Sequence, residues 1–191
     1  MNPSPEDLAR LTATVEAFCQ LIDRLPARAL LEKPWGPRQV LSHLVFWHEN
    51  YVRQIEARLA GKGWLLPEGT FNQLNADAVA SLATVGAPTL IARFRAANTR
   101  LCRLAMQPKA DSVHVQLKAD SKAWPLDEFL VMVEAHIRRH GDDLRKSHVV
   151  RSGGSGSAPK ASWAGHARLP DGKARLLCHC EEAAGRRHSL P

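Results

Sequence analysis

The chain has 191 residues, enough for one domain with a hydrophobic core, or for one domain followed by a tail. Its hydrophobic content of 45% and charged content of 24% are ordinary for a globular protein. Its apolar runs are all far shorter than the ~20 residues that a membrane-spanning helix needs, and "MNPSPEDLARL" is unlike a secretory signal. We therefore expect a cytoplasmic protein with no membrane partner.

The net charge of +7 is unevenly distributed, with +4 of it in residues 147–191. The preceding part is only mildly basic, which argues against nucleic acid as a partner. The cysteines do not suggest a disulfide framework, because Cys19 and Cys102 sit alone in helical patterns and no export signal is present.

In chain order, the first predicted helix runs from about Pro5 to Leu25. Ser4 can cap it, and a proline suits its first position. A second helix begins near Pro37 and ends before Gly61, a residue type that favours helix ends. Apolar residues recur along one side of both segments.

A long connection follows the second helix and is expected to hold a short helix over residues 71–81. Residues 88–106 form the third long helix by their apolar periodicity. The alternating stretch "SVHVQL" indicates either a small strand or an extended loop. The last helix is predicted from Pro125 to about Lys146.

Four long helices, with a long connection between the second and the third, predict an all-α fold, a four-helix bundle. We assign residues 1–148 to this domain. Residues 149–191 begin with a Gly/Ser/Pro-rich stretch and have few large apolar groups, so we expect a disordered tail.

A histidine pair on the last predicted helix is the first functional signal. His136 and His140 are four residues apart, so their imidazoles lie about 40° from each other around the helix and can reach one metal ion. Viewed down the helix axis, His140 lies between Phe129 and Val133, on the apolar side. Alternatively, one ring donates to a carbonyl or a tyrosine while the other reaches solvent.

The second helix offers further histidines. His43 lies at the edge of the apolar stripe, and His48 lies near its centre. One histidine from this helix and two from the last helix would make a three-nitrogen site with a position open for water or substrate, which is typical of catalytic rather than structural metal centres.

The stretch "LIDRLP…PWGPRQVLSHLVFWHENYVRQI" resembles the second-helix signature of the DinB-like superfamily. Its pattern Trp-x-x-x-x-Val-Leu-x-His-Leu-x-x-Trp is similar to that of the ClbS/DfsB branch of four-helix bundle proteins. "KAWPLDEFLVMVEAHIRRH" and "TFNQLNADAV" resemble the last helix and the connecting helix of that branch. The resemblance covers roughly residues 5–146.

The resemblance implies that His43, His136 and His140 bind a divalent metal ion, commonly nickel or zinc. His48 is a departure, because an acidic residue is expected there; it could be a ligand, a base or a core residue. Tyr51 and His48 are the candidate catalytic residues. Trp47 and Tyr51 are the candidate contacts to a bound small molecule.

Two classes of function follow from the resemblance. One is a metal-dependent hydrolase or thiol transferase that detoxifies reactive small molecules. The other is a self-protection protein that binds and sequesters such a molecule without turnover. A homodimer is compatible with either class.

Overall fold

The computed structural model describes the backbone of residues 3–31 and 35–152 and the side chains as far as residue 147. The helices are α1 (Pro5–Asp23), α2 (Ala27–Leu30), α3 (Pro37–Leu59), α4 (Phe71–Ser81), α5 (Ala87–Ala105), the 3-10 helix η1 (Ala110–Ser112) and α6 (Leu126–Ser152). The strands are β1 (His114–Gln116) and β2 (Ala123–Pro125). None of the helices described is long and apolar enough to cross a membrane.

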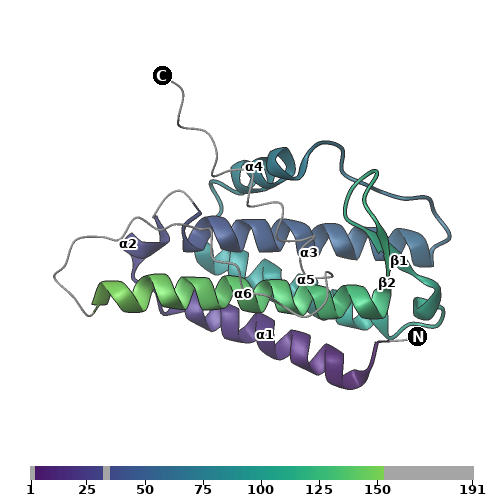
Figure 1. Cartoon of the computed structure of the whole chain (residues 1–191), viewed down its shortest axis with the longest axis horizontal. Helices are drawn as coiled ribbons and strands as arrows, with labels where there is room; N and C mark the ends of the chain where they lie inside the picture. The colour runs from purple at the N-terminus through teal and green to yellow at the C-terminus, as the bar shows by residue number, and fades with distance from the viewer. Residues whose placement is uncertain (1–2, 32–34, 153–191) are drawn as a thin grey trace.

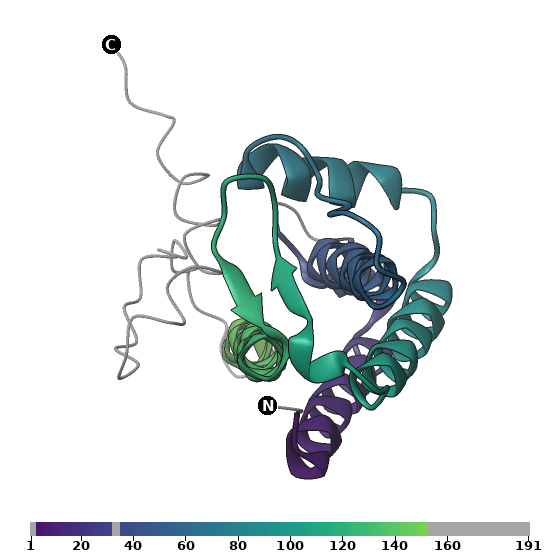
Figure 2. The same cartoon turned by 90° about the vertical axis from the view of Figure 1, so that its right-hand side faces the viewer.

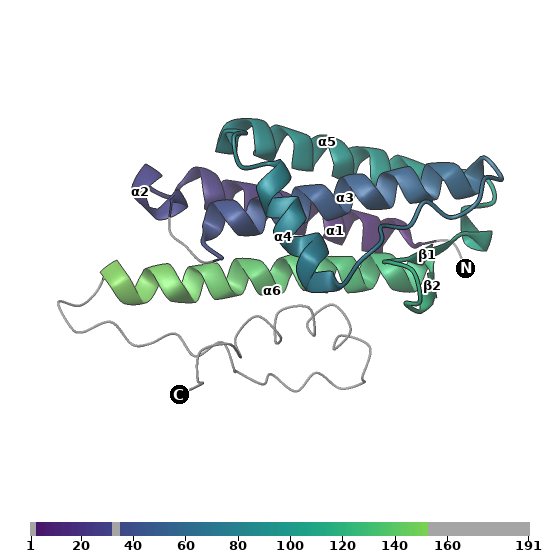
Figure 3. The ribbon, with the colours of Figure 1, turned by 90° about the horizontal axis from the view of Figure 1, so that it is seen from above.

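The four long helices α1, α3, α5 and α6 lie side by side along the long axis of the molecule (Figure 1). Helix α1 packs against α5 and α6, and α3 packs mainly against α5. Figure 2 views this arrangement nearly along the helices. Helix α4 lies within the long connection after α3 and crosses α3 on the outside of the long helices (Figure 3).

The core forms where the apolar stripes of the long helices meet. The apolar side of α1 faces inward: Leu21 is partly buried, and the buried residues are Leu8, Leu11, Val15, Phe18, Cys19 and Ile22. Phe18 of α1 meets Phe94 of α5 edge to face, with ring centroids 6.1 Å apart. Burial of these stripes removes apolar surface from water, which is the main favourable term in folding.

The local signals at the helix starts act as the sequence suggests. The Ser4 hydroxyl accepts a hydrogen bond from the Asp7 backbone N–H at 3.1 Å, and proline occupies the first turn of α1, α3 and α5. Thr70 and Gln73 form a capping box at the start of α4. Helix α4 has the bounds that the periodicity predicts.

The small sheet corrects the all-α prediction, although the described chain is mostly helical. β1 and β2 pair antiparallel, with Val115 opposite Trp124. In "SVHVQL" the residues Val113, Val115 and Leu117 are buried while His114 is exposed, so the alternation is that of a half-buried strand. The short helices α2 and η1 were not predicted.

Helix α6 is longer than predicted and continues to Ser152, four residues past the proposed domain boundary. The disordered tail assigned to residues 149–191 lies almost wholly outside the described residues. Its disorder stays a prediction.

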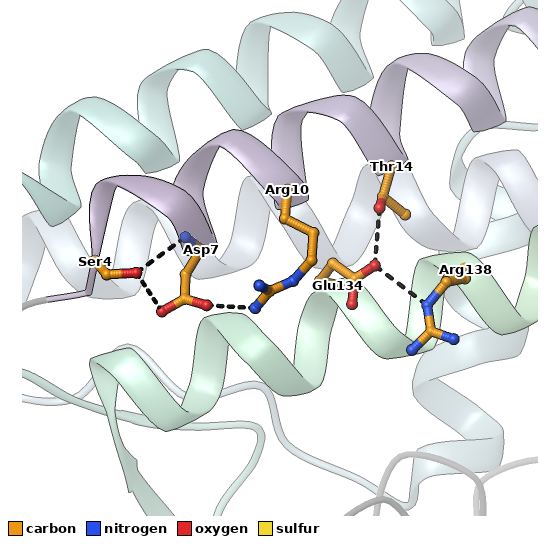
Figure 4. Close-up of polar contacts among 6 residues, drawn as sticks. All are labelled: Ser4, Asp7, Arg10, Thr14, Glu134 and Arg138. Carbon is orange, nitrogen blue, oxygen red and sulfur yellow. Dashed lines mark hydrogen bonds and ion pairs between the residues drawn. The ribbon is translucent and has the colours of Figure 1, made fainter.

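Figure 4 shows polar contacts of α1 and α6, one of which joins the two helices. The Glu134 carboxylate is only 5% exposed and accepts a hydrogen bond from the Thr14 hydroxyl at 2.8 Å. Arg138 donates to the same oxygen at 3.3 Å. Nearer the N-terminus, Asp7 pairs with Arg10. The buried carboxylate is therefore paired across the helix interface rather than left alone.

Candidate metal centre

Three histidines from two helices meet inside the molecule. His43 comes from α3, and His136 and His140 come from α6. Each offers a ring nitrogen, and these nitrogens all lie within 4.8 Å of one another. The His43 ring centroid is 5.5 Å from each of the other two. The structure therefore brings together the three residues that the sequence singled out.

Helix geometry sets the pair on α6. Four residues are just over one turn, so His136 and His140 project from the same side. Their Nε2 atoms lie 2.8 Å apart, and their ring centroids lie 4.5 Å apart. His140 is 4% exposed, as expected for its place on the apolar side, and His136 lies at the partly buried margin.

His43 reaches the pair across the bundle and is held between two tryptophans. Its ring makes edge contacts with Trp35 and Trp47, at centroid distances of 5.7 Å and 6.5 Å. The residue is 4% exposed, and within the described chain neither ring nitrogen has a hydrogen-bond partner. Because buried polar atoms without partners are costly, this ring is suited to a ligand from outside the protein.

Burial keeps the cluster uncharged at neutral pH. It lowers the pKa of His43 from 6.5 to about 4, with the nearby Asn75 side chain acting in the opposite direction. Burial also holds the pKa of His136 and of His140 well below 6.5, assisted by the neighbouring histidines. Neutral imidazole is the form that binds metal, because its lone pair is free of a proton.

The donor set fits a divalent transition metal. Zinc binds histidine nitrogen at about 2.0–2.1 Å, so two ligands of a tetrahedral ion lie roughly 3.3 Å apart. With all the nitrogens within 4.8 Å of one another, His43 would need only a modest approach, while the Nε2 atoms of His136 and His140, now 2.8 Å apart, would separate slightly. Imidazole suits both nickel and zinc, and three nitrogens leave a fourth position open.

A small cavity adjoins the cluster. The centre of a water-sized sphere can move within about 10 Å³ of it, so the cavity has room for roughly one water molecule. Trp47 and Tyr51, the side chains expected to contact a ligand, are in its wall and stack with centroids 6.1 Å apart. The full lining is His43, Trp47, Tyr51, Phe71, Asn75, Leu117 and His136.

His48 does not line this cavity. Its ring packs edge-on against Phe94 of α5 at 4.7 Å and lies 5.8 Å from the Tyr51 ring. Burial lowers its pKa to about 3, opposed by a hydrogen bond with the Leu44 backbone one turn earlier. Its placement favours the core interpretation over a role as ligand or base.

Sequence reasoning missed the contribution of Asn75. This residue enters the cavity wall from α4, and its Oδ1 accepts a hydrogen bond from Trp47 Nε1 at 2.9 Å. A signal was present: Asn75 follows Leu74 and precedes Ala78 by one turn on the buried side of a short helix. A polar residue in that position needs a partner inside the protein.

Comparison with solved structures finds a matching fold in the crystal structure of the mycothiol-dependent maleylpyruvate isomerase. The TM-score is 0.60 at 16% sequence identity, and the match covers 73% of this chain and 59% of that one. The likeness shows a shared helical fold. The sequence matches no protein-family model and no curated protein.

Proposed function

We propose that this chain is a DinB-like four-helix bundle protein that binds one divalent metal ion, nickel or zinc, through His43, His136 and His140. The observation that carries the proposal is the convergence of three neutral imidazoles, two buried and one partly buried, of which His43 has two ring nitrogens without partners in the described chain. A structural role would need only apolar contacts, and three histidines in one place serve that role poorly.

The proposed activity is that of a metal-dependent hydrolase or thiol transferase acting on reactive small molecules, as the ClbS/DfsB resemblance implies. When bound, a divalent ion with one open position polarises a substrate oxygen or lowers the pKa of water or a thiol. Support for a thiol comes from the shared fold with an enzyme that is mycothiol-dependent by name. The match covers only 59% of that enzyme, so we do not propose that this chain catalyses the same reaction.

In this proposal the chain's own residues bind and shield the substrate. Trp47, Tyr51 and Phe71 supply an apolar, aromatic wall around a cavity with room for roughly one water-sized group, so the reacting group of the substrate would enter it and bulk water would be excluded. Tyr51 is 1% exposed and stacks on Trp47, so its position is fixed before a substrate arrives. We place this reaction in the cytoplasm.

A second function, sequestration without turnover, is favoured by the cavity lining. Among the described residues, the lining contains no carboxylate, and only Tyr51 and the histidines can move a proton there. A binding protein needs no such group. Nucleic acid is not a proposed partner, and a homodimer remains compatible with both functions.

Metal analysis of freshly purified protein tests the proposal. We expect about one nickel or zinc ion per chain in the wild type and in His114→Ala, which removes an exposed histidine of β1. His140→Ala should retain no metal and should still fold, because apolar packing holds the helices together. Metal retained at the wild-type level in His140→Ala would refute the assignment of ligands.

A further inference from the structure

Asn75 is held in one orientation by Trp47. The indole Nε1–H of Trp47 donates to Asn75 Oδ1 at 2.9 Å, and Asn75 is 1% exposed. Because the oxygen is committed to the indole, the amide NH₂ must point elsewhere. The orientation of this side chain is thus set by a buried contact between α3 and α4.

The amide nitrogen of Asn75 is a buried donor without a well-formed hydrogen bond in the described chain, although the side chain lies close enough to the His43 ring to influence its pKa. Nδ2 has no hydrogen-bond partner within the described chain. Unsatisfied buried donors are uncommon in native proteins and often mark a place where a ligand or water binds. Asn75 shares the cavity wall with His43 and His136, while aromatic and aliphatic side chains form the remainder.

We propose that Asn75 Nδ2 donates a hydrogen bond to an oxygen atom of the molecule bound beside the histidines, and that it thereby selects substrates carrying a carbonyl or carboxylate oxygen. An amide NH₂ can only donate, so it favours an acceptor and disfavours a cation or another donor. The inference rests on the proposed function in assuming that the substrate binds next to the three histidines.

The shape of the cavity agrees with this role. It accommodates about one oxygen-sized group next to Asn75 and His43. A larger molecule would have to displace Phe71, which is only partly buried at the start of α4. The oxygen of the substrate would then lie by the polar groups, and its apolar part by the rings.

A purely structural role for Asn75 would use only its oxygen, as the acceptor for Trp47. Asn75→Leu removes both functions of the amide. Asn75→Asp keeps an oxygen for the indole and removes the NH₂. Asn72→Leu is the matched control, because Asn72 is exposed on the same helix.

The experiment is a titration of zinc-treated and metal-free protein with sodium formate, the smallest carboxylate. Binding is followed by NMR through the side-chain amide signal of Asn75, identified by its loss in Asn75→Leu. We expect formate to move one Asn75 amide proton downfield. Its affinity should fall about tenfold or more in Asn75→Leu and Asn75→Asp, and stay unchanged in Asn72→Leu. Thermal melts check that each variant folds.

The inference is overturned if formate fails to bind, if saturating formate leaves the Asn75 signal in place, or if Asn75→Leu binds formate as the wild type does. A different result would refute the metal centre alone. Wild-type protein that retains no zinc, yet shows the Asn75 shift with formate, would refute the metal centre and leave this inference intact.

Discussion

The Nε2 atoms of His136 and His140 lie 2.8 Å apart, within hydrogen-bonding distance. One ring must donate its proton and the other must accept, because two protonated rings at this distance would repel each other. Burial holds the pKa of both rings well below 6.5, so the pair is neutral at pH 7. A metal ion bound by both nitrogens would take the place of this shared proton contact.

Metal affinity should be nearly independent of pH between 7.5 and 5.5. Protons compete for a ligand only when the pH approaches its pKa in the folded protein, which is about 4 for His43 and well below 6.5 for the other two. We expect a change in zinc affinity of about threefold or less across this range, measured by competition with a chelator of known affinity. A tenfold or greater loss for each pH unit below 6.5 would show that one or more of the three ligands titrates normally.

His48 should make the fold sensitive to acid. Its pKa is about 3 in the folded protein and near 6.5 when unfolded, so only the unfolded chain binds the proton between these values. Stability therefore rises with pH in this window and is lost as the pH falls from 6.5 towards 3. His48→Leu should reduce the loss of unfolding free energy between pH 7 and pH 5 by about 2 kcal/mol.

Urea unfolding of wild type and His48→Leu at the two pH values measures this difference. His114→Leu is the matched substitution at an exposed histidine of β1. If His48→Leu loses as much stability as the wild type on acidification, His48 does not carry the proposed penalty.

The contact between Thr14 and Glu134 should stabilise the packing of α1 on α6. Thr14→Val removes the hydroxyl that donates to a carboxylate only 5% exposed. Loss of a hydrogen bond to a buried charged group costs about 1.5–3 kcal/mol in unfolding free energy. Thr99→Val, at an exposed position of α5, should change it by less than about 0.5 kcal/mol.

A double-mutant cycle separates the contact from other effects of the substitution. Combined with Glu134→Gln, Thr14→Val should cost clearly less than it does alone, because the charged acceptor is gone. Strict additivity of the two substitutions would mean that the hydrogen bond contributes nothing of its own.

Removal of the tail should leave the fold in place. Leu144 is the last buried residue among the described side chains, so a chain ending after Lys146 retains the described core. We expect it to melt within a few degrees of the full chain by circular dichroism, and a chain ending after Ser152 to melt closer still. Loss of a cooperative transition in both would contradict the proposed domain boundary.

Helix positions could be predicted because the signals are local. Caps and prolines mark the starts of α1 and α3, and apolar periodicity marks their buried faces. The sequence could not decide between a strand and a loop for "SVHVQL", because the pairing of Val115 with Trp124 joins residues nine apart across a loop. The end of α6 at Ser152 was missed because a Gly/Ser-rich stretch nearby suggested an earlier stop.

The histidine cluster was predictable in part. The spacing of His136 and His140 places them together by helix geometry alone, whereas the approach of His43 depends on how α3 packs against α6. The position of Asn75 on the buried side of α4 indicated that it needs a partner, but its contact with Trp47 on another helix could not be read from the local pattern.

The central claim is that His43, His136 and His140 hold one metal ion, and X-ray absorption at the zinc edge of zinc-loaded protein tests it most directly. The account predicts imidazole scattering from three nitrogens at about 2.0–2.1 Å, with two remaining in His140→Ala if any metal is still bound. Sulfur at about 2.3 Å, or a spectrum of hydrated zinc without imidazole, would contradict it.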